Sequence, residues 1–247
     1  MNFDDTYIDA PLYAEDALVK HFYDAALPSR YGSNFMVFKH MPSLEEFKHY
    51  EQQQKAFHTL HNMTHRRFLF PENEAFTTDV AQYITAQHYD VGSLELYAML
   101  PIEFHGRLNE EVVVQYVDNT LFDAYLAFQY TIDLEHGEAF AAEKQQLFKQ
   151  QFYESHVMFV AALIDGVIVG TLTLFETPDT IELDSFVVAH AFQRRGIGST
   201  MQHFVMTNHT TQTILLVADG DDTPREMYQK QGYHYCAARH EILIVLS

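Results

Sequence analysis

The chain has 247 residues, of which 47% are hydrophobic and 14% aromatic, and this excludes a disordered chain and supplies enough apolar material for one large or two modest domains. Thirty-four acidic against fifteen basic residues give a formal net charge of −19. A protein that binds nucleic acid through a broad basic surface is therefore not expected, whereas a cationic small molecule or a basic peptide would be attracted.

The first hundred residues are predicted to alternate helices with short strands. Apolar positions at helical spacing predict a helix over residues 13–26. Ser43 and Glu46 have the spacing of a capping box, which predicts a helix from there to about residue 63. The other elements expected here are strands over 34–39, 67–70 and 93–100 and a helix over 78–88 with Thr78 as its N-cap.

A stretch of Pro, Gly and mixed polar residues over 101–109 is the predicted junction between an N-terminal α/β domain (1–101) and a second domain (102–247). In the second domain, Asp165-Gly166 predicts a tight hairpin turn. The elements expected there are strands over 112–117, 156–163, 167–175, 181–189, 213–218 and 233–246 and helices over 120–133, 138–154, 199–209 and 223–231. Helices that interrupt an antiparallel meander, with a βαβ step in the second half, indicate the α+β class.

The most informative stretch is the loop Gln193-Arg194-Arg195-Gly196-Ile197-Gly198, which follows an apolar strand and precedes a helix expected to begin at residue 199. Two glycines allow the backbone to approach a ligand closely, and the first turn of the helix offers free N–H groups and a partial positive charge. With its paired arginines, the loop is predicted to bind a pyrophosphate. A dinucleotide-binding fingerprint fails because the third glycine is missing, and a P-loop fails because no Gly-Lys-Ser/Thr follows.

This loop resembles the Q/R-x-x-G-x-G/A motif of the GCN5-related N-acetyltransferase (GNAT) family. The resemblance continues downstream, where a strand over 214–218 is followed by Asp221 at a position where the family often has Asn, by Tyr228 in a helix and by Gly232-Tyr233. It is specific from about residue 156 to residue 233. It implies a GNAT-like, mostly antiparallel sheet flanked by helices.

The resemblance also implies the function, which is acetyl transfer from acetyl-CoA to an amine, with no metal. Tyr228 would protonate the leaving thiolate, because the pKa of a tyrosine is near that of the thiol. The competing hypothesis is a non-catalytic acyl-CoA sensor or interaction module that keeps the loop without turnover. The implied coenzyme-binding residues are Phe186, Val187 and Val188 for the acetyl and pantetheine end, Gln193, Arg194, Arg195, Gly196, Ile197, Gly198, Ser199 and Thr200 for the pyrophosphate, and Asp221 for one further contact.

Two carboxylates are candidates for the general base. Glu182 and Asp184 alternate along a strand, so they share a face, and continued alternation would put Phe186 and Val188 on that face as well. Either carboxylate could take a proton from the acceptor ammonium, directly or through water. The alternative is that both are solvent-facing charges, and between the two Glu182 is slightly favoured.

A metal site is the main competing constellation in the first half. His58, His61 and His65 share one helical face if the helix continues that far, but no Cys or His-Glu-x-x-His pattern completes a zinc set. We therefore interpret the histidines as a polar helix face and expect no metal.

The role of residues 1–101 stays open between a degenerate copy of the same fold and a cap on the acceptor site. In either case the strand over 93–100 could pair with or pack on the catalytic sheet. A single cysteine, Cys236, excludes an internal disulfide, and no uncharged run approaches the roughly 18 residues that a bilayer requires, so we expect a cytoplasmic protein that binds neither membrane nor nucleic acid. The acceptor is expected to be a small-molecule or peptide amine; the sequence indicates neither its identity nor the oligomeric state.

Overall fold

A computed structural model describes residues 1–220 and 225–246. The elements of the first half are β1 (Leu12–Glu15), β2 (Val19–Phe22), β3 (Phe35–Phe38), α1 (Leu44–Leu60), β4 (His65–Glu72), α2 (Thr78–Ala86) and β5 (Asp90–Met99). Those of the second half are β6 (Val113–Tyr116), α3 (Phe122–Asp133), α4 (Glu138–Gln151), β7 (Val157–Ile164), β8 (Val167–Glu176), β9 (Thr180–Val188), α5 (Ile197–Asn208), β10 (Thr213–Asp219), α6 (Arg225–Gln231) and β11 (His234–Val245).

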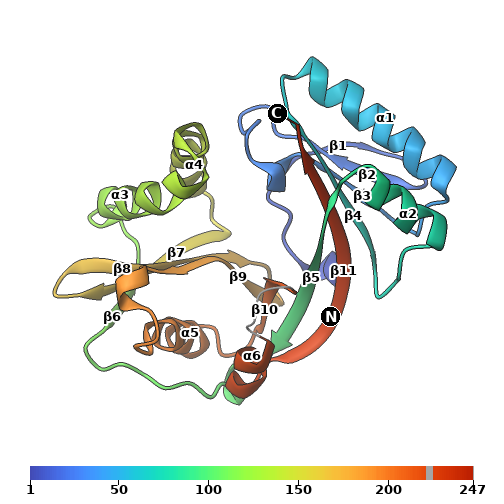
Figure 1. Ribbon diagram of the computed structural model, residues 1–247. Coiled ribbons are helices and arrows are strands. Elements are labelled where there is room, and N and C mark those ends of the chain that lie inside the picture. Colours follow the sequence, from blue (N-terminus) through green and yellow to red (C-terminus); the bar gives the residue numbers. More distant parts are fainter. Residues whose placement is uncertain (221–224, 247) are drawn as a thin grey trace.

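All strands join one mixed, mostly antiparallel sheet in the order β1-β2-β3-β4-β11-β5-β10-β9-β8-β7-β6. In the second half, α3 and α4 cover one face of the sheet and α5 the other, while α1 and α2 cover the first half (Figure 1). The predicted α+β class with a GNAT-like sheet flanked by helices is confirmed. No helix in the described residues has the length and apolarity that crossing a bilayer would need.

The two halves repeat the same order of elements. The first runs β1-β2-β3-α1-β4-α2-β5 and the second β7-β8-β9-α5-β10-α6-β11. In each, three antiparallel strands are followed by a helix and a strand that pairs parallel to the third, as β3 with β4 and β9 with β10. The βαβ step predicted for the second half therefore has a counterpart in the first, as a degenerate copy requires.

The repeat extends to the last turn of each half. His88 (φ 60°) ends α2 and Gly232 (φ 105°) ends α6, and a tyrosine follows each. The N–H of Tyr89 bonds the carbonyl of Ile84, and the N–H of Tyr233 bonds that of Tyr228. A residue with positive φ is what this type of helix ending uses.

The halves exchange their last strands. Strand β5, from the first half, pairs with β10 through Ile214 and Met99, and strand β11, from the second half, pairs with β4. The two exchanged strands pair antiparallel with each other at the centre of the sheet, where green β5 and red β11 cross in Figure 1. The prediction that the strand over 93–100 pairs with the catalytic sheet is confirmed, whereas the division at residues 101 and 102 stays a prediction.

The exchange predicts that residues 102–247 do not fold alone. Without β5, both β10 and β11 would lose a pairing partner, and two apolar strand edges would be open to aggregation. We expect the fragment to be recovered as aggregates while the full chain is well behaved. Size-exclusion chromatography and far-UV circular dichroism test this, and a monomeric fragment with native strand content would contradict it.

Residues 12–22 form the β1–β2 hairpin, so the helix predicted over 13–26 is wrong. The carboxylate of Asp16 accepts hydrogen bonds from the N–H groups of Leu18 and Val19, both at 2.8 Å, and this closes the turn between the strands. Strand β2 then pairs along its whole length with β3. Tertiary pairing has overridden a helical spacing of apolar residues.

The start of α1 is as predicted. The side chain of Ser43 accepts the N–H of Glu46, and the Glu46 carboxylate accepts the N–H of Ser43. The start of α2 needs a small correction, because its N-cap is Thr77 and Thr78 is its first residue. The N-terminus of helix α1 is thus capped by side chains of its own sequence.

Candidate functional site

The predicted pyrophosphate loop forms a tight turn into α5. Arg194 (φ 60°) and Gly196 (φ 80°) have left-handed backbone conformations, and Gly196 is the N-cap of α5. The helix therefore begins at Ile197, which is two residues earlier than predicted. No side chain caps this helix, and its first turn carries no acidic residue. Because the first N–H groups of a helix have no intrahelical partner, those of α5 are available to an anion.

The equivalent turn in the first half lacks this property. Helix α1 is capped by Ser43 and Glu46 and has Glu45 in its first turn. These side chains occupy the N–H groups and oppose an anion. Among the described residues, the N–H groups at the start of the βαβ helix are thus uncapped by a side chain in the second half and capped in the first.

Strands β9 and β10 separate beside this turn. Their parallel pairing runs from Thr180 and Thr213 to Leu183 and Leu216, and β9 then continues to Val188 without β10. A cavity of about 340 Å³ lies at this separation, between β9, α5 and α6. Its lining residues are Phe186, Val188, Phe192, Gln193, Arg194, Gly196, Ile197, Gly198, Ser199, Gln202, Met227, Tyr228 and Gln231.

Most of the predicted coenzyme-binding residues line this cavity, but Val187, Arg195 and Thr200 do not. Arg195 forms an ion pair with Glu111 at 3.4 Å. The hydroxyl of Thr200 donates to the carbonyl of Gly196 and accepts the N–H of Asn109, both at 2.9 Å, so it braces the loop. Asp221 lies outside the described residues.

Four cavity residues were not predicted: Phe192, Gln202, Met227 and Gln231. Gln202 accepts a hydrogen bond from the hydroxyl of buried Tyr233 at 2.9 Å, and Gln231 donates to Ser199 at 3.2 Å. Their position depends on how α5 packs against α6. No local motif marks them, although the amphipathic spacing of α5 would have placed Gln202 on its inner face.

A β-bulge in β9 makes the predicted assignment of its side chains to the two faces of the sheet wrong. Ser185 has φ 49°, and the pairing register with β8 shifts between Thr171 and Thr173. An extra residue reverses the alternation of side chains. Phe186 and Val188 therefore pack with the α5 core, on the side of the cavity, and not on the face of Glu182 and Asp184.

Glu182 lies on the opposite face, toward α3 and α4, next to Phe175 of the neighbouring strand. Only 8% of its surface is exposed, so it is not a solvent-facing charge. Its Oε2 accepts the backbone N–H of Tyr7 at 2.5 Å. Burial raises the pKa of Glu182 to about 7; nearby Asp184 also raises it, whereas the Tyr7 N–H and Arg239 lower it. A carboxylate that titrates near neutrality is suited to general base catalysis.

Further charged groups gather over this face. Lys144 of α4 is buried, which lowers its pKa, and it interacts electrostatically with Asp133 and Asp184. Burial raises the pKa of Asp133, at the end of α3. Arg30 from the first half forms an ion pair with Asp9 at 2.6 Å. Lys144 therefore lies near Asp184 of β9, and Arg30 of the first half also acts on Lys144.

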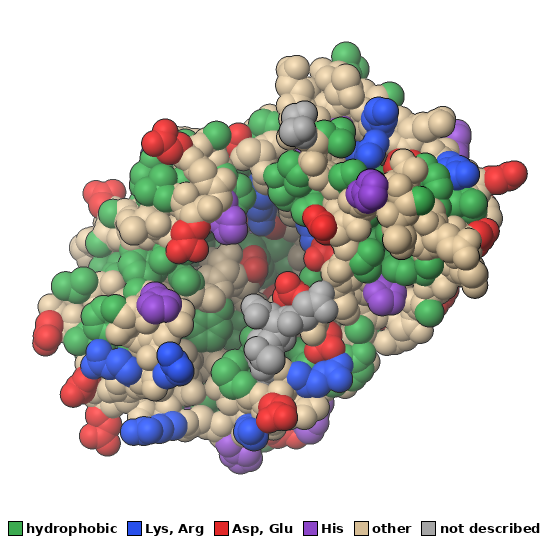
Figure 2. Space-filling model, viewed as in Figure 1, with side chains coloured by type: hydrophobic (Ala, Val, Ile, Leu, Met, Phe, Trp, Pro, Cys, Tyr) green, Lys and Arg blue, Asp and Glu red, His purple; other side chains and the backbone are tan. Residues whose placement is uncertain are grey.

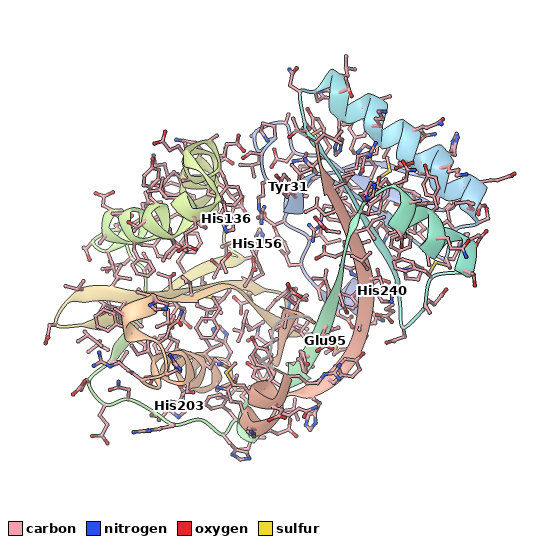
Figure 3. All side chains as sticks on the ribbon, viewed as in Figure 1. Tyr31, Glu95, His136, His156, His203 and His240 are labelled. Atoms are coloured by element: carbon pink, nitrogen blue, oxygen red, sulfur yellow. The ribbon has the colours of Figure 1, made fainter. Side chains whose placement is uncertain are left out.

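The surface is hollowed between the α3/α4 layer and the first half, with acidic and basic side chains inside the hollow (Figure 2). Tyr31, His136 and His156 lie beside this opening (Figure 3). The hollow and the cavity are on opposite faces of the sheet, and β9 lies between them. Two ligands could therefore approach the separated strands from opposite sides.

Tyr228 lies at the cavity on α6, half-buried. Its ring centroid is 5.3 Å from that of Tyr97 and 5.6 Å from that of Tyr233. Tyr97 is fully buried and donates its hydroxyl to Glu95, so it is committed elsewhere. Among these three tyrosines, Tyr228 alone lines the cavity.

The three histidines considered as zinc ligands lie in an aromatic cluster. The prediction that they form a polar helix face is therefore wrong. His58 and His65 are 2% and 1% exposed, and each bonds a backbone carbonyl, that of His65 and that of Asn34 respectively. His61 contacts the hydroxyl of Tyr23 at 2.9 Å. Within residues 1–220 and 225–246, no three His, Cys, Asp or Glu side chains are arranged to hold a metal ion.

The two halves of the chain match two different protein families. Residues 1–97 match a family described as a domain of unknown function (DUF5613), and residues 121–233 match the acetyltransferase (GNAT) family. No curated protein matches the sequence.

Three solved structures share the fold over most of the chain. A functionally unknown conserved protein from Staphylococcus epidermidis is 29% identical, with a TM-score of 0.90, over 100% of this chain and 98% of that chain. A GCN5-related N-acetyltransferase from Kribbella flavida is 13% identical, with a TM-score of 0.62, over 93% and 87%. A tandem GNAT protein from the clavulanic acid biosynthesis pathway is 9% identical, with a TM-score of 0.58, over 92% and 78%. Together with the motif and the strand order, the family match shows that residues 121–233 form a domain of the acetyltransferase (GNAT) family.

Proposed function

We propose that the chain is an N-acetyltransferase that moves an acetyl group from acetyl-CoA to a primary amine, by direct attack in a ternary complex. The observation that carries this proposal is the cavity at the separated strands, which is bounded at one end by the uncapped N-terminus of α5 and contains Tyr228. It combines a site for an anion, an apolar channel and a proton donor in one continuous space.

The residues of the cavity suit the parts of acetyl-CoA. The N–H groups at the start of α5, with Arg194, would hold the pyrophosphate. Phe186, Val188 and Phe192 would line the pantetheine arm. The coenzyme supplies an activated thioester, and the backbone N–H groups of unpaired β9 could stabilise the oxyanion that develops on attack.

The opposite face would hold the acceptor. Glu182, or Asp184 as the alternative, would take a proton from the acceptor ammonium, and the neutral amine would then attack the thioester carbonyl. A C–N bond forms, the C–S bond breaks, and Tyr228 gives a proton to the leaving thiolate. The second proton, which the attacking nitrogen loses as it becomes an amide, returns through solvent to the Tyr228 oxygen. The carboxylates at the hollow and the net charge of −19 favour a cationic acceptor, either a small molecule or a peptide.

Calorimetry and thiol release test the proposal. We expect heat on titration of the full chain with acetyl-CoA, and free thiol that appears only when a suitable amine is present. The amine panel should include polyamines, aminoglycosides and basic peptides, with neutral and acidic amines for comparison. Binding without amine-dependent thiol release across the panel would favour the acyl-CoA sensor, and the absence of binding would exclude both functions.

Gly196→Ala is predicted to weaken acetyl-CoA binding about tenfold. An alanine at φ 80° costs about 1–2 kcal/mol, and its Cβ would lie 2.9 Å from the carbonyl oxygen of Arg107, so the loop must shift. Gly166→Ala is the matched control, because Gly166 has φ 78° in the β7–β8 hairpin and no atom within 4 Å of the added Cβ. Calorimetry should show weaker binding for the first variant only; equal affinities would place the coenzyme elsewhere.

A further inference from the structure

The N-terminal segment, residues 2–9, crosses the face of the sheet that carries Glu182. Figure 1 shows it, in blue, running from the centre of the sheet between the two halves. At its start, the ring of Phe3 packs on Leu96 and Ala237 of the exchanged strands, and its N–H donates to Glu72 at 3.0 Å. At its end, Asp9 is held by Arg30 at 2.6 Å. Both ends are therefore anchored to the fold.

Between these anchors, Tyr7 is fixed at three points around Glu182. Its backbone N–H donates to Oε2 of Glu182 at 2.5 Å. Its ring stacks on Phe175 with centroids 4.1 Å apart and planes inclined by 21°. Its hydroxyl lies 3.0 Å from Nε2 of His156. Phe175 is the cross-strand partner of Glu182, so all three contacts meet at one position of the sheet.

As a result, the two carboxylate oxygens of Glu182 differ in their hydrogen bonding. Oε2 accepts the Tyr7 N–H, and this is the one hydrogen bond that the Glu182 carboxylate makes with the described residues. The other charged groups that act on this carboxylate are Asp184, two residues along β9, and Arg239 of β11. Tyr7 is the group that holds it by a hydrogen bond.

We propose that Tyr7 is a positioning residue of the transferase, whose backbone N–H fixes the Glu182 carboxylate and directs Oε1 to the acceptor amine. This inference rests on the proposed function and assigns a role in the site to a segment some 175 residues away in sequence from Glu182. The ring of Tyr7 forms a wall of the acceptor site together with Phe175 and His156.

Tyr7→Pro tests the role of the N–H, with Tyr7→Ala as its matched control. Both variants lose the ring and the hydroxyl, but only proline also removes the donor. Thr6 has φ −87° and ψ 152°, a conformation that a following proline accepts. A hydrogen bond to the charged form lowers the pKa of a carboxylate. We therefore expect kcat/KM to rise with pH about one pH unit higher for Tyr7→Pro than for Tyr7→Ala, measured at the midpoint of the rise.

The wild-type chain supplies a second measurement that needs no variant. The Tyr7 amide proton resonance should shift with pH with the same midpoint as kcat/KM. Equal kinetic midpoints for the two variants would overturn the inference, and so would a Tyr7 amide resonance that stays constant between pH 5 and pH 9. If the wild type shows no amine-dependent thiol release at all, the proposed function fails instead, while the amide titration still reports on the contact itself.

Discussion

Glu182→Gln is expected to remove most amine-dependent turnover while making the protein more stable at pH 8. Glutamine keeps the shape of the side chain and can still accept the Tyr7 N–H, but it cannot take a proton from the acceptor. General base catalysis contributes about 10²- to 10⁴-fold, so kcat should fall by about that factor. Thiol release at saturating acetyl-CoA measures it, and the Kd for acetyl-CoA should not change because Glu182 is outside the cavity.

The gain in stability follows from the raised pKa. Burial raises the pKa of Glu182 to about 7 from an ordinary 4.5, so between these values the native state binds more protons than the unfolded state. The free energy of unfolding therefore decreases as the pH rises from about 4.5 to 7, and above pH 7 the whole cost of the buried charge is present. Glutamine removes this cost, which is about 3 kcal/mol at pH 8 and near zero at pH 4.5.

Denaturant unfolding at both pH values measures the effect. Glu135→Gln is the matched control, because it removes an exposed carboxylate and should leave stability unchanged at either pH. A destabilised Glu182→Gln variant at pH 8 would mean that the carboxylate is ionised and structurally required. An active and stabilised variant would mean that the burial is real but the base is another group.

Asp184→Asn separates the two candidate bases. Asp184 is half-buried, and its Oδ1 accepts the N–H of Ser185 at 2.7 Å at the bulge. It therefore has a structural task of its own, and we expect a smaller loss of kcat than for Glu182→Gln. A larger loss for Asp184→Asn would exchange the two roles.

The loop and the helix start that line the cavity could be predicted because their signal is local. The glycines and arginines of the loop, the strand before it and the helix after it are consecutive in the sequence, and backbone conformation alone brings them together. The hairpin at Asp165 and Gly166 is likewise local, with φ 51° and 78° as its turn type requires.

The surroundings of Glu182 could not be predicted, because they are assembled from distant segments. Glu182 accepts the N–H of Tyr7 from the first half, and Lys144 interacts electrostatically with Asp184 and with Arg30 of the first half. The bulge at Ser185 interrupts the alternation of side chains from which the faces of β9 were assigned. The β1–β2 hairpin was missed for the same reason, since a strand pairing cannot be read from the spacing of one segment.

The two halves differ in the helix N-terminus at their βαβ steps. In both halves a helix connects the two strands of a parallel pair, but the N-terminus of α1 is closed by its own capping box and that of α5 is not. Beside the first-half pair, a second cavity of about 510 Å³ is lined in part by Asn2, Phe3 and Asp4 of the N-terminal segment. The same segment that holds Glu182 thus also borders the equivalent position in the first half.

Tyr228→Phe is expected to lower kcat about 10²-fold and leave the Kd for acetyl-CoA unchanged. The ring stays against Tyr97 and Tyr233, so the cavity keeps its shape, but the thiolate would leave without a proton donor. Tyr97→Phe is the matched control, because its hydroxyl is committed to Glu95 and does not line the cavity. If both variants keep wild-type turnover, water protonates the thiolate, and Tyr228 serves only as part of the cavity wall. If they lose turnover equally, the loss comes from packing in the tyrosine cluster and gives no support to a proton transfer.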